Sequence, residues 1–427
     1  MVGSLLVVPR TLEILNRRSL HHYPKVTQLI GQSESGCTLI VKGDQIHISI
    51  HTSAIGFETD NVILFWEKGF GHDLSNPPML DGKSMHVDLD NLMQRVETFY
   101  TYFRDSLRFT LPGSKADRYK MMVMLNYSLE GTAYGGTYDN FIGALWVAPN
   151  RVQDRKLNCI AHELGHSFQL QIPADSISDA WGGSGFYEMT SQWMLWHVNP
   201  DWLTDENYHF EAYRKAIHKA YLDGENIYRS PYVLQYWARK RGKTCIADLY
   251  RNGLRGEDPV ITYQRLYGLT QQQFCDEMID ACQHIVPLDL GHAWSETRQY
   301  ACTFDSPMQS VGKNRYAPAD EVIPEDYGFN AIRLQPIRAG RKVTAVVESD
   351  STMRYGFVAV TADGKAHYGA PVSSGKATFT IPRGQEVRAL YLVVMGAPTE
   401  HKMLTWWNRT PNRQYPYVVE FKGVSLE

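Results

Sequence analysis

Asn158-Cys-Ile-Ala-His-Glu-Leu-Gly-His-Ser-Phe-Gln-Leu-Gln171 is the most informative stretch of this 427-residue chain. Residues four apart on an α-helix share one face, so the imidazoles of His162 and His166 can both face a single metal ion. Glu163 would then face the same cavity. Apolar residues recur here at helical spacing, with Asn158 as a suitable cap and Pro173 as the end. The stretch therefore predicts a metal-binding helix.

A catalytic zinc ion takes three protein ligands and keeps one position for water, so a third ligand is expected elsewhere. Glu188 lies 22 positions after His166 (188 − 166), which leaves room for a loop and a second helix, predicted over residues 186–197. Gln192, one turn further along, could hold the outer nitrogen of a histidine through a hydrogen bond, and Ser191 could do the same. The alternatives to Glu188 as third ligand are Asp175 and Asp179.

The remaining pattern predicts an α+β protein. Strands are expected at residues 62–66, 119–126 and 141–148, and an amphipathic helix with Asp88 as its cap at residues 88–107. Further helices are expected at residues 207–223, 230–241, 243–251 and 270–285. From about Ile323 onward, short alternating runs separated by turns predict a β-sandwich. The expected parts are an N-terminal α/β part, a helical part with the metal site, and a β-sandwich domain, over residues 1–150, 151–322 and 323–427.

His162-Glu163-x-x-His166 followed by Glu188 resembles the gluzincin group of zinc metallopeptidases, mainly over residues 130–200. The order of the parts is similar to that of uncharacterised secreted bacterial members, and in outline to mucin-directed peptidases with β-sandwich modules. The metzincin pattern is excluded, because it requires glycine and histidine where this chain has Gln169 and Ile172. The chain departs from many gluzincins at Gln192, where they carry an acidic or another small residue.

The resemblance implies a Zn²⁺-dependent hydrolase that cleaves peptide bonds in protein, peptide or glycoprotein substrates, with Glu163 as general base. Members bind an extended substrate along an edge strand just before the metal helix. In this chain the strand through Gly143, Ala144 and Leu145 occupies that place. Members also use a Tyr or His to stabilise the oxyanion, and Tyr232 is the first candidate. Its competitors are Tyr228, His209 and His218.

Composition and charge exclude several classes of partner. The net charge is −3 with no acidic or basic tail, so nucleic acid is not an expected partner. No run approaches the roughly 18 apolar residues that a membrane span needs. The first ten residues do not resemble a signal peptide. The protein is therefore expected to be cytoplasmic or, as the resemblance implies, secreted, periplasmic or at the cell surface, with a leader outside this sequence. The six cysteines form no C-x-x-C, which favours buried free thiols.

Two other functions fit the same sequence. One is a carbohydrate- or host-surface-binding protein with a structural or vestigial metal site. Tyr391, Trp406 and Trp407 are its candidate sugar-binding face, although hydrophobic packing explains them better. The intact His162, Glu163 and His166 argue against it, because a structural zinc has no use for the adjacent glutamate. The other is a zinc hydrolase that acts on a different amide, such as a cell-wall peptide.

Overall fold

A computed structural model describes residues 37–38, 49–51, 58–71, 73–178, 181, 185–403 and 412–427. The chain divides into two compact units, residues 1–179 and 180–427. Helices and sheets both occur, so the predicted α+β class is confirmed. The division differs from the three predicted parts: the helix with His162 and His166 falls in the first unit, and the other helices share the second unit with the sandwich.

The first unit contains a six-stranded sheet in the order β1-β2-β3-β4-β6-β5. Its central strands β3, β4 and β6 are parallel, and β5 pairs antiparallel with β6 on one side. The strands are β1 (Cys37–Thr38), β2 (Ser49–His51), β3 (Val62–Glu67), β4 (Met121–Leu125), β5 (Ala133–Tyr138) and β6 (Ile142–Val147). The predicted strands at β3, β4 and β6 are confirmed, whereas β5 was not predicted.

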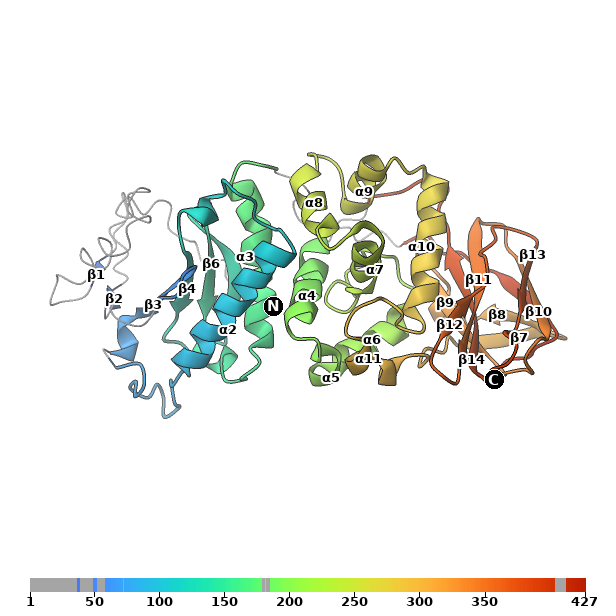
Figure 1. Cartoon of the computed structure of the whole chain (residues 1–427), viewed down its shortest axis with the longest axis horizontal. Coiled ribbons are helices and arrows are strands. Elements are labelled where there is room, and N and C mark those ends of the chain that lie inside the picture. Colours follow the sequence, from blue (N-terminus) through green and yellow to red (C-terminus); the bar gives the residue numbers. More distant parts are fainter. Residues whose placement is uncertain are drawn as a thin grey trace. The chain divides into compact units, whose positions relative to one another are not determined.

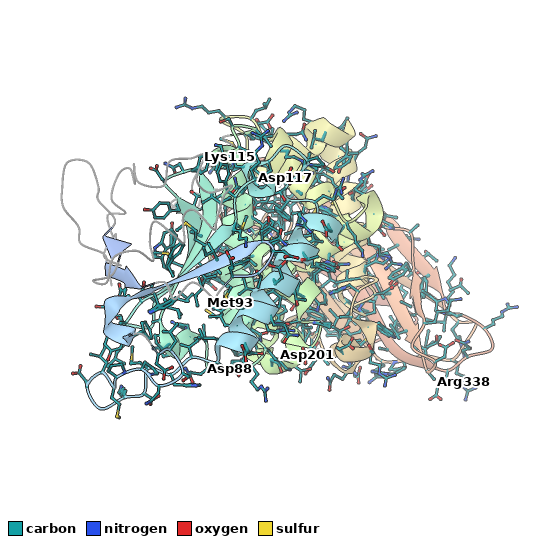
Figure 2. The ribbon with its side chains drawn as sticks, turned by 60° about the vertical axis from the view of Figure 1, so that its left-hand side comes forward. Asp88, Met93, Lys115, Asp117, Asp201 and Arg338 are labelled. Atoms are coloured by element: carbon teal, nitrogen blue, oxygen red, sulfur yellow. The ribbon has the colours of Figure 1, made fainter. Side chains whose placement is uncertain are left out.

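Two helices, α2 (Leu89–Thr101) and α3 (Asn158–Ala174), cover one face of this sheet (Figure 1). Asp88 begins α2, as predicted, by accepting a hydrogen bond from the Asn91 amide at 3.1 Å (Figure 2). After Thr101 the helix continues as a π-helical turn, Tyr102–Ser106. Rings from both segments contact Phe168, with the centroids of Tyr100 and Phe103 at 5.0 and 5.6 Å, and so hold α2 against α3.

Hydrogen bonds join the C-terminal end of α3 to a short 3-10 helix, Lys115–Asp117. The Lys115 side chain donates to the Ala174 carbonyl, and Asp175 accepts from the Ser114 hydroxyl at 2.6 Å and the Lys115 amide at 2.9 Å. Pro173 lies inside the last turn rather than ending the helix. Asp175, one of the alternative metal ligands, is therefore already engaged in holding the helix end.

The second unit begins with helices: α4 (Phe186–Val198), α5 (Trp202–Asp205), α6 (Asn207–Ala216), α7 (Tyr232–Arg241), α8 (Cys245–Asn252), α9 (Pro259–Tyr267), α10 (Gln271–Ile285) and α11 (Trp294–Thr297). The predicted helices are confirmed, but the one expected at residues 207–223 ends at Ala216. Helix α9 was missed, and it is capped by Asp258, which accepts from the Ile261 amide at 2.9 Å. Other short 3-10 helices lie at Lys68–Phe70, Pro149–Arg151, Arg298–Tyr300 and Asp320–Val322.

Two antiparallel sheets follow and share one hydrophobic core, which confirms the predicted β-sandwich. The sheet orders are β13-β10-β15-β8-β7 and β12-β11-β14-β9. The strands are β7 (Met308–Gly312), β8 (Arg315–Pro318), β9 (Phe329–Leu334), β10 (Lys342–Glu348), β11 (Met353–Thr361), β12 (Ala366–Tyr368), β13 (Lys376–Thr380), β14 (Val387–Gly396) and β15 (Val418–Lys422). Strands β7 and β8 belong to the five-stranded sheet of the sandwich. The sandwich therefore begins before residue 323, where the sequence predicted its start.

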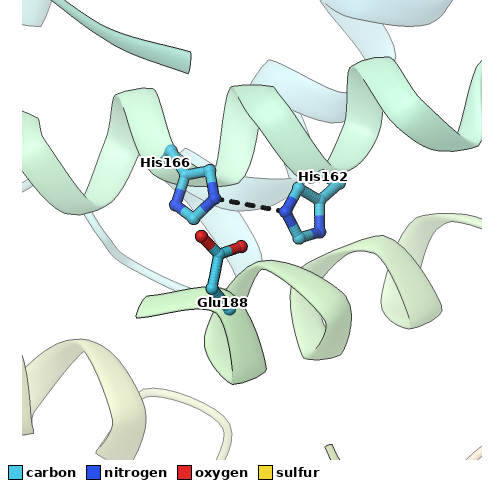
Figure 3. Close-up of side chains that lie close together, drawn as sticks. All are labelled: His162, His166 and Glu188. Carbon is cyan, nitrogen blue, oxygen red and sulfur yellow. Dashed lines mark hydrogen bonds between the residues drawn. The ribbon is translucent and has the colours of Figure 1, made fainter. Parts of the chain in front are cut away.

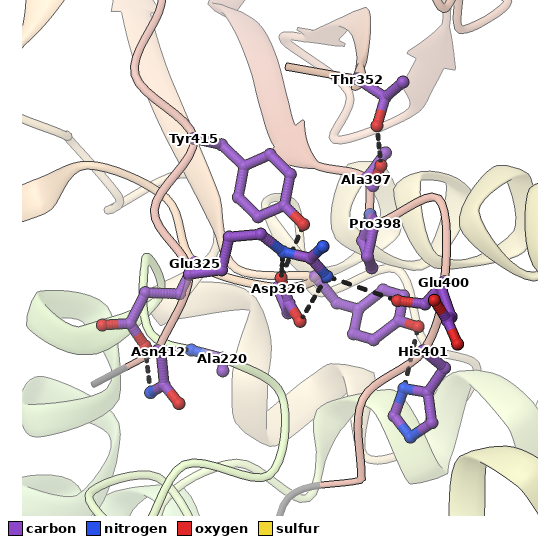
Figure 4. Close-up of polar contacts among 12 residues, drawn as sticks. Ala220, Glu325, Asp326, Thr352, Ala397, Pro398, Glu400, His401, Asn412 and Tyr415 are labelled. Atoms are coloured by element: carbon purple, nitrogen blue, oxygen red, sulfur yellow. Dashed lines mark hydrogen bonds and ion pairs between the residues drawn. The ribbon is translucent and has the colours of Figure 1, made fainter. Parts of the chain in front are cut away.

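Polar contacts tie the sandwich to the helices of the same unit (Figure 4). Glu325 accepts a hydrogen bond from the Ala220 amide at 2.8 Å, and the Asp326 carbonyl accepts one from the Tyr221 amide at 3.2 Å. His401 Nε2 lies 2.6 Å from the Asp258 carboxylate, and both side chains are only 6% exposed. Helix α10 also packs against β11 and β14 (Figure 1). The helices and the sandwich therefore form one packed body.

Candidate metal centre

The two histidines of α3 face each other as their spacing predicts. Their Nε2 atoms are 3.1 Å apart, and their rings are nearly perpendicular, at 85°. Two nitrogens bound tetrahedrally to one zinc ion at about 2.0–2.1 Å would be roughly 3.3 Å apart. The pair therefore fits a shared metal ion.

Gln169 fixes the orientation of one of these rings. Its side-chain oxygen lies 3.2 Å from Nδ1 of His166, and the glutamine is fully buried. An acceptor at this position favours the tautomer with hydrogen on Nδ1, which leaves the lone pair of Nε2 directed toward His162. From the sequence, Gln169 was only a departure from the metzincin pattern. Its spacing of three residues from His166 was the signal for this contact.

Glu188, in the first turn of α4, completes the group. One ligand atom from each of His162, His166 and Glu188 lies within 4.8 Å of the others (Figure 3). Among the described residues, this is the one group of three or more His, Cys, Asp or Glu side chains that could hold a metal. Two imidazoles and one carboxylate match the ligand set of catalytic zinc sites. Asp179, the other alternative ligand, lies outside the described residues.

Glu163 lies against the outermost strand of the sheet. Its carboxylate accepts a hydrogen bond from the Gly135 amide of β5 at 2.7 Å. Strand and helix approach so closely that a Cβ atom on Gly135 would lie 1.7 Å from the main-chain oxygen of Glu163. Glycine is therefore required at this position, and the approach places the Glu163 carboxylate beside the main chain of β5.

The predicted substrate strand is wrong by one strand. Gly143, Ala144 and Leu145 belong to β6, which lies between β4 and β5 and is not an edge strand. Helix α3 also holds this strand, because the Gly143 amide donates to Gln171 and the Ala144 carbonyl accepts from Ser167, each at 2.8 Å. Among the described strands, β5 is the one that ends the sheet beside α3. Strand β5 was not expected from the sequence, because Gly135 and Gly136 are typical of a turn.

The structure does not favour Tyr232 as the oxyanion donor. Its side chain is 0% exposed and packs against the rings of Trp196 and Tyr213, with centroids at 5.7 and 4.7 Å. Burial raises the pKa of its hydroxyl well above the usual value of 10. His218 is also buried, at 7% exposure. The aromatic core therefore explains Tyr232 better than contact with a substrate does.

The two remaining candidates are linked to α4 through Gln192. Its amide nitrogen donates to the Tyr228 carbonyl at 3.0 Å and lies 3.4 Å from Nε2 of His209. Tyr228 is 40% exposed, whereas Ser191 is fully buried on α4. Gln192 was predicted to orient a metal-binding histidine. The contacts join it to the segments that carry Tyr228 and His209, one turn beyond Glu188, and its predicted role stays a prediction.

Of the three residues considered for a sugar-binding face, the structure describes Tyr391. Tyr391 is fully buried, and its hydroxyl donates to the Cys302 carbonyl at 2.6 Å. Trp406 and Trp407 lie outside the described residues. Tyr391 is therefore a core residue.

The fold and the His, His, Glu group define an α+β protein with a candidate metal centre. The chain belongs to a family described as a family of unknown function, DUF6055, which matches residues 47–427. No curated protein matches the chain at a significant level. In the described ranges, none of the helices combines the length and the apolar character that crossing a membrane requires.

Proposed function

We propose that this protein is a zinc-dependent hydrolase of the gluzincin type, which cleaves peptide bonds in protein or glycoprotein substrates. The observation that carries the proposal is the grouping of His162, His166 and Glu188 within 4.8 Å, with Glu163 next to the first histidine in the chain. A structural metal site would have no need of that glutamate.

A zinc ion held by these three residues would supply the Lewis acidity that activates water and polarises a carbonyl group. Glu163 would accept the proton of the attacking water and deliver it to the leaving amine. Its position supports this role, because its carboxylate lies at hydrogen-bonding distance from β5. An extended peptide that added to the outer strand β5 would bring its main chain beside Glu163. Tyr228 and His209 are the proposed oxyanion donors in place of Tyr232.

The proposal is tested by metal analysis and by hydrolysis of a peptide library. The wild type is expected to bind about one zinc per chain, His162→Ala to lose it, and Glu188→Ala to bind it much more weakly. Glu163→Gln should keep its zinc and lose hydrolysis by about 10²–10⁴-fold, because it removes the general base. The matched control is Glu130→Gln, at an exposed carboxylate, which should keep both properties.

Each result bears on one part of the proposal. Full hydrolysis by Glu163→Gln would disprove the general-base mechanism. Zinc retained at wild-type affinity by Glu188→Ala would remove Glu188 from the ligand set. Absence of zinc from the wild type, even after supplementation, would instead favour the carbohydrate- or surface-binding function.

A further inference from the structure

The first unit contains a cavity, separate from the proposed metal ligands, at a place where a ligand could bind. This cavity of about 280 Å³ is lined by residues from three separate connections. Lys83 and Ser84 come from the connection that follows β3, Ser128 from the one that follows β4, and Asn150 and Gln153 from the one that follows β6. The three connections that build the cavity are thus those that leave the three parallel strands.

In sheets with parallel strands, this edge is a common place for a ligand to bind. Parallel strands end at the same edge, and ligands bind in the crevice outside their carboxyl ends. Strands β3, β4 and β6 are parallel neighbours, so their connections meet at one edge of the sheet. The cavity therefore lies where the topology of the sheet favours a binding site, and it contains none of the proposed metal ligands.

The lining is rich in hydrogen-bond donors and contains no carboxylate. Lys83 supplies a cation, and Ser84, Ser128 and Asn150 supply hydroxyl and amide groups. Gln153 is held in place because its amide nitrogen donates to the carbonyls of His86 and Pro149, at 3.0 and 2.7 Å. One cation among neutral donors, with no carboxylate in the lining itself, favours an anionic group over a cationic one.

The cavity adjoins the first residues of the outer strand β5. The connection from Ser128 leads directly into this strand, and its Thr132 carbonyl accepts from the Ala148 amide at 2.8 Å. A Cβ atom on Gly131 would lie 3.1 Å from the side-chain nitrogen of Asn150. In an antiparallel pair the chains run in opposite directions, so a peptide paired with β5 would direct its C-terminal end toward this cavity.

We propose that this cavity binds a carboxylate group in the C-terminal part of an extended peptide, with Lys83 as its charge partner and Asn150 as a hydrogen-bond donor. The carboxylate is either the terminus of the peptide or an acidic side chain near it. The cavity and its lining carry the binding step by themselves. The step from binding to selection of a cleaved substrate rests on the proposed function.

The test is a calorimetric titration of the full chain carrying Glu163→Gln, so that the peptides are not consumed. Three acetylated alanine pentapeptides are compared: one with a free C-terminal carboxylate, one with a C-terminal amide, and one with the amide and a glutamate at the last position. At least one acidic peptide should bind about fivefold or more tighter than the neutral amide, and its preference should weaken with salt. Which of them does so identifies the source of the carboxylate.

Lys83→Met and Asn150→Ala, added to the same chain, should reduce this preference, and Lys376→Met, at an exposed lysine of β13, should leave it intact. Equal binding of the acidic and neutral peptides would overturn the inference, as would a preference that persists in Lys83→Met. Repeating the titration with His162→Ala separates the two proposals. A preference that survives in this zinc-free chain shows that the cavity binds without the metal site, whereas absence of zinc and hydrolysis from the wild type would reject the proposed function and leave the cavity standing.

Discussion

Among single residues, Gln169 is the position where a substitution should weaken metal binding with little effect on folding. Its side-chain oxygen, 3.2 Å from Nδ1 of His166, sets the tautomer that leaves Nε2 available to a metal. Gln169→Leu keeps a similar volume but removes this acceptor. We expect zinc affinity to fall about 10–100-fold, which is typical when the partner of a ligating histidine is lost. Competition with a chromophoric chelator measures the affinity.

The matched control for this prediction is Gln171→Leu on the same helix. Gln171 is also buried, but its oxygen accepts from the Gly143 amide at 2.8 Å and its nitrogen donates to Asp175 at 2.9 Å. Its loss leaves a buried amide without its partner, which costs about 1–3 kcal/mol of unfolding free energy. Zinc affinity should stay near the wild-type value. Equal losses of affinity in both variants would mean that Gln169 acts only through packing.

At the scale of elements, the close approach of β5 and α3 gives a prediction about stability. A Cβ atom on Gly135 would lie 1.7 Å from the Glu163 carbonyl oxygen, so Gly135→Ala forces the strand and helix apart. Overpacking of this kind costs about 1–3 kcal/mol or more and should lower the melting temperature. Gly224→Ala is the control, because a Cβ atom there meets nothing within 4 Å. Calorimetry that shows the same melting temperature for both variants would contradict the predicted approach.

Strand β5 and helix α3 also show which parts of the fold and of the candidate site could be predicted from the sequence. The helical spacing of His162 and His166 is local, so the metal-binding face of α3 followed directly from it. The edge strand was misassigned because the order of strands in a sheet depends on distant pairing, which local alternation does not reveal. Gly135 and Gly136 also suggested a turn, whereas Gly135 is there to admit a neighbouring helix. Tyr232 was misjudged because spacing cannot distinguish a buried aromatic residue from an exposed one.

At the scale of the whole molecule, buried histidines make the stability of the second unit depend on pH. His197 stacks on His292 with centroids 4.1 Å apart, and its Nε2 lies 2.9 Å from the Gln235 side-chain oxygen. Burial lowers the pKa of both histidines below the usual 6.5, and for His197 the neighbouring His292 adds to the effect. The unfolded chain therefore binds more protons than the native one below about pH 6.5. The unfolding free energy should be constant above this pH and fall below it.

The slope should approach about 1.4 kcal/mol per pH unit for each such histidine. Urea unfolding between pH 8 and pH 5, followed by tryptophan fluorescence, measures this dependence. His197→Phe should flatten it, since phenylalanine does not titrate. Trp193 still donates to Gln235 at 2.9 Å, so the glutamine keeps a partner in this variant. An unchanged pH profile in His197→Phe would show that other groups cause the loss of stability.

The extent of the second unit leads to a prediction about fragments. The sequence placed the start of the sandwich at residue 323, because composition changes there, but β7 and β8 come earlier and β8 pairs with β15. A fragment of residues 323–427 lacks both strands, leaves one side of β15 unpaired, and loses α10, which packs on β11 and β14. It also lacks Asp258, the partner of the buried His401.

We expect the fragment of residues 323–427 to be unfolded or aggregated. Residues 180–427 should fold, because they retain these contacts. Two-dimensional ¹H–¹⁵N NMR of both fragments tests this, and a well-dispersed spectrum from residues 323–427 would show that the sandwich is an autonomous domain after all.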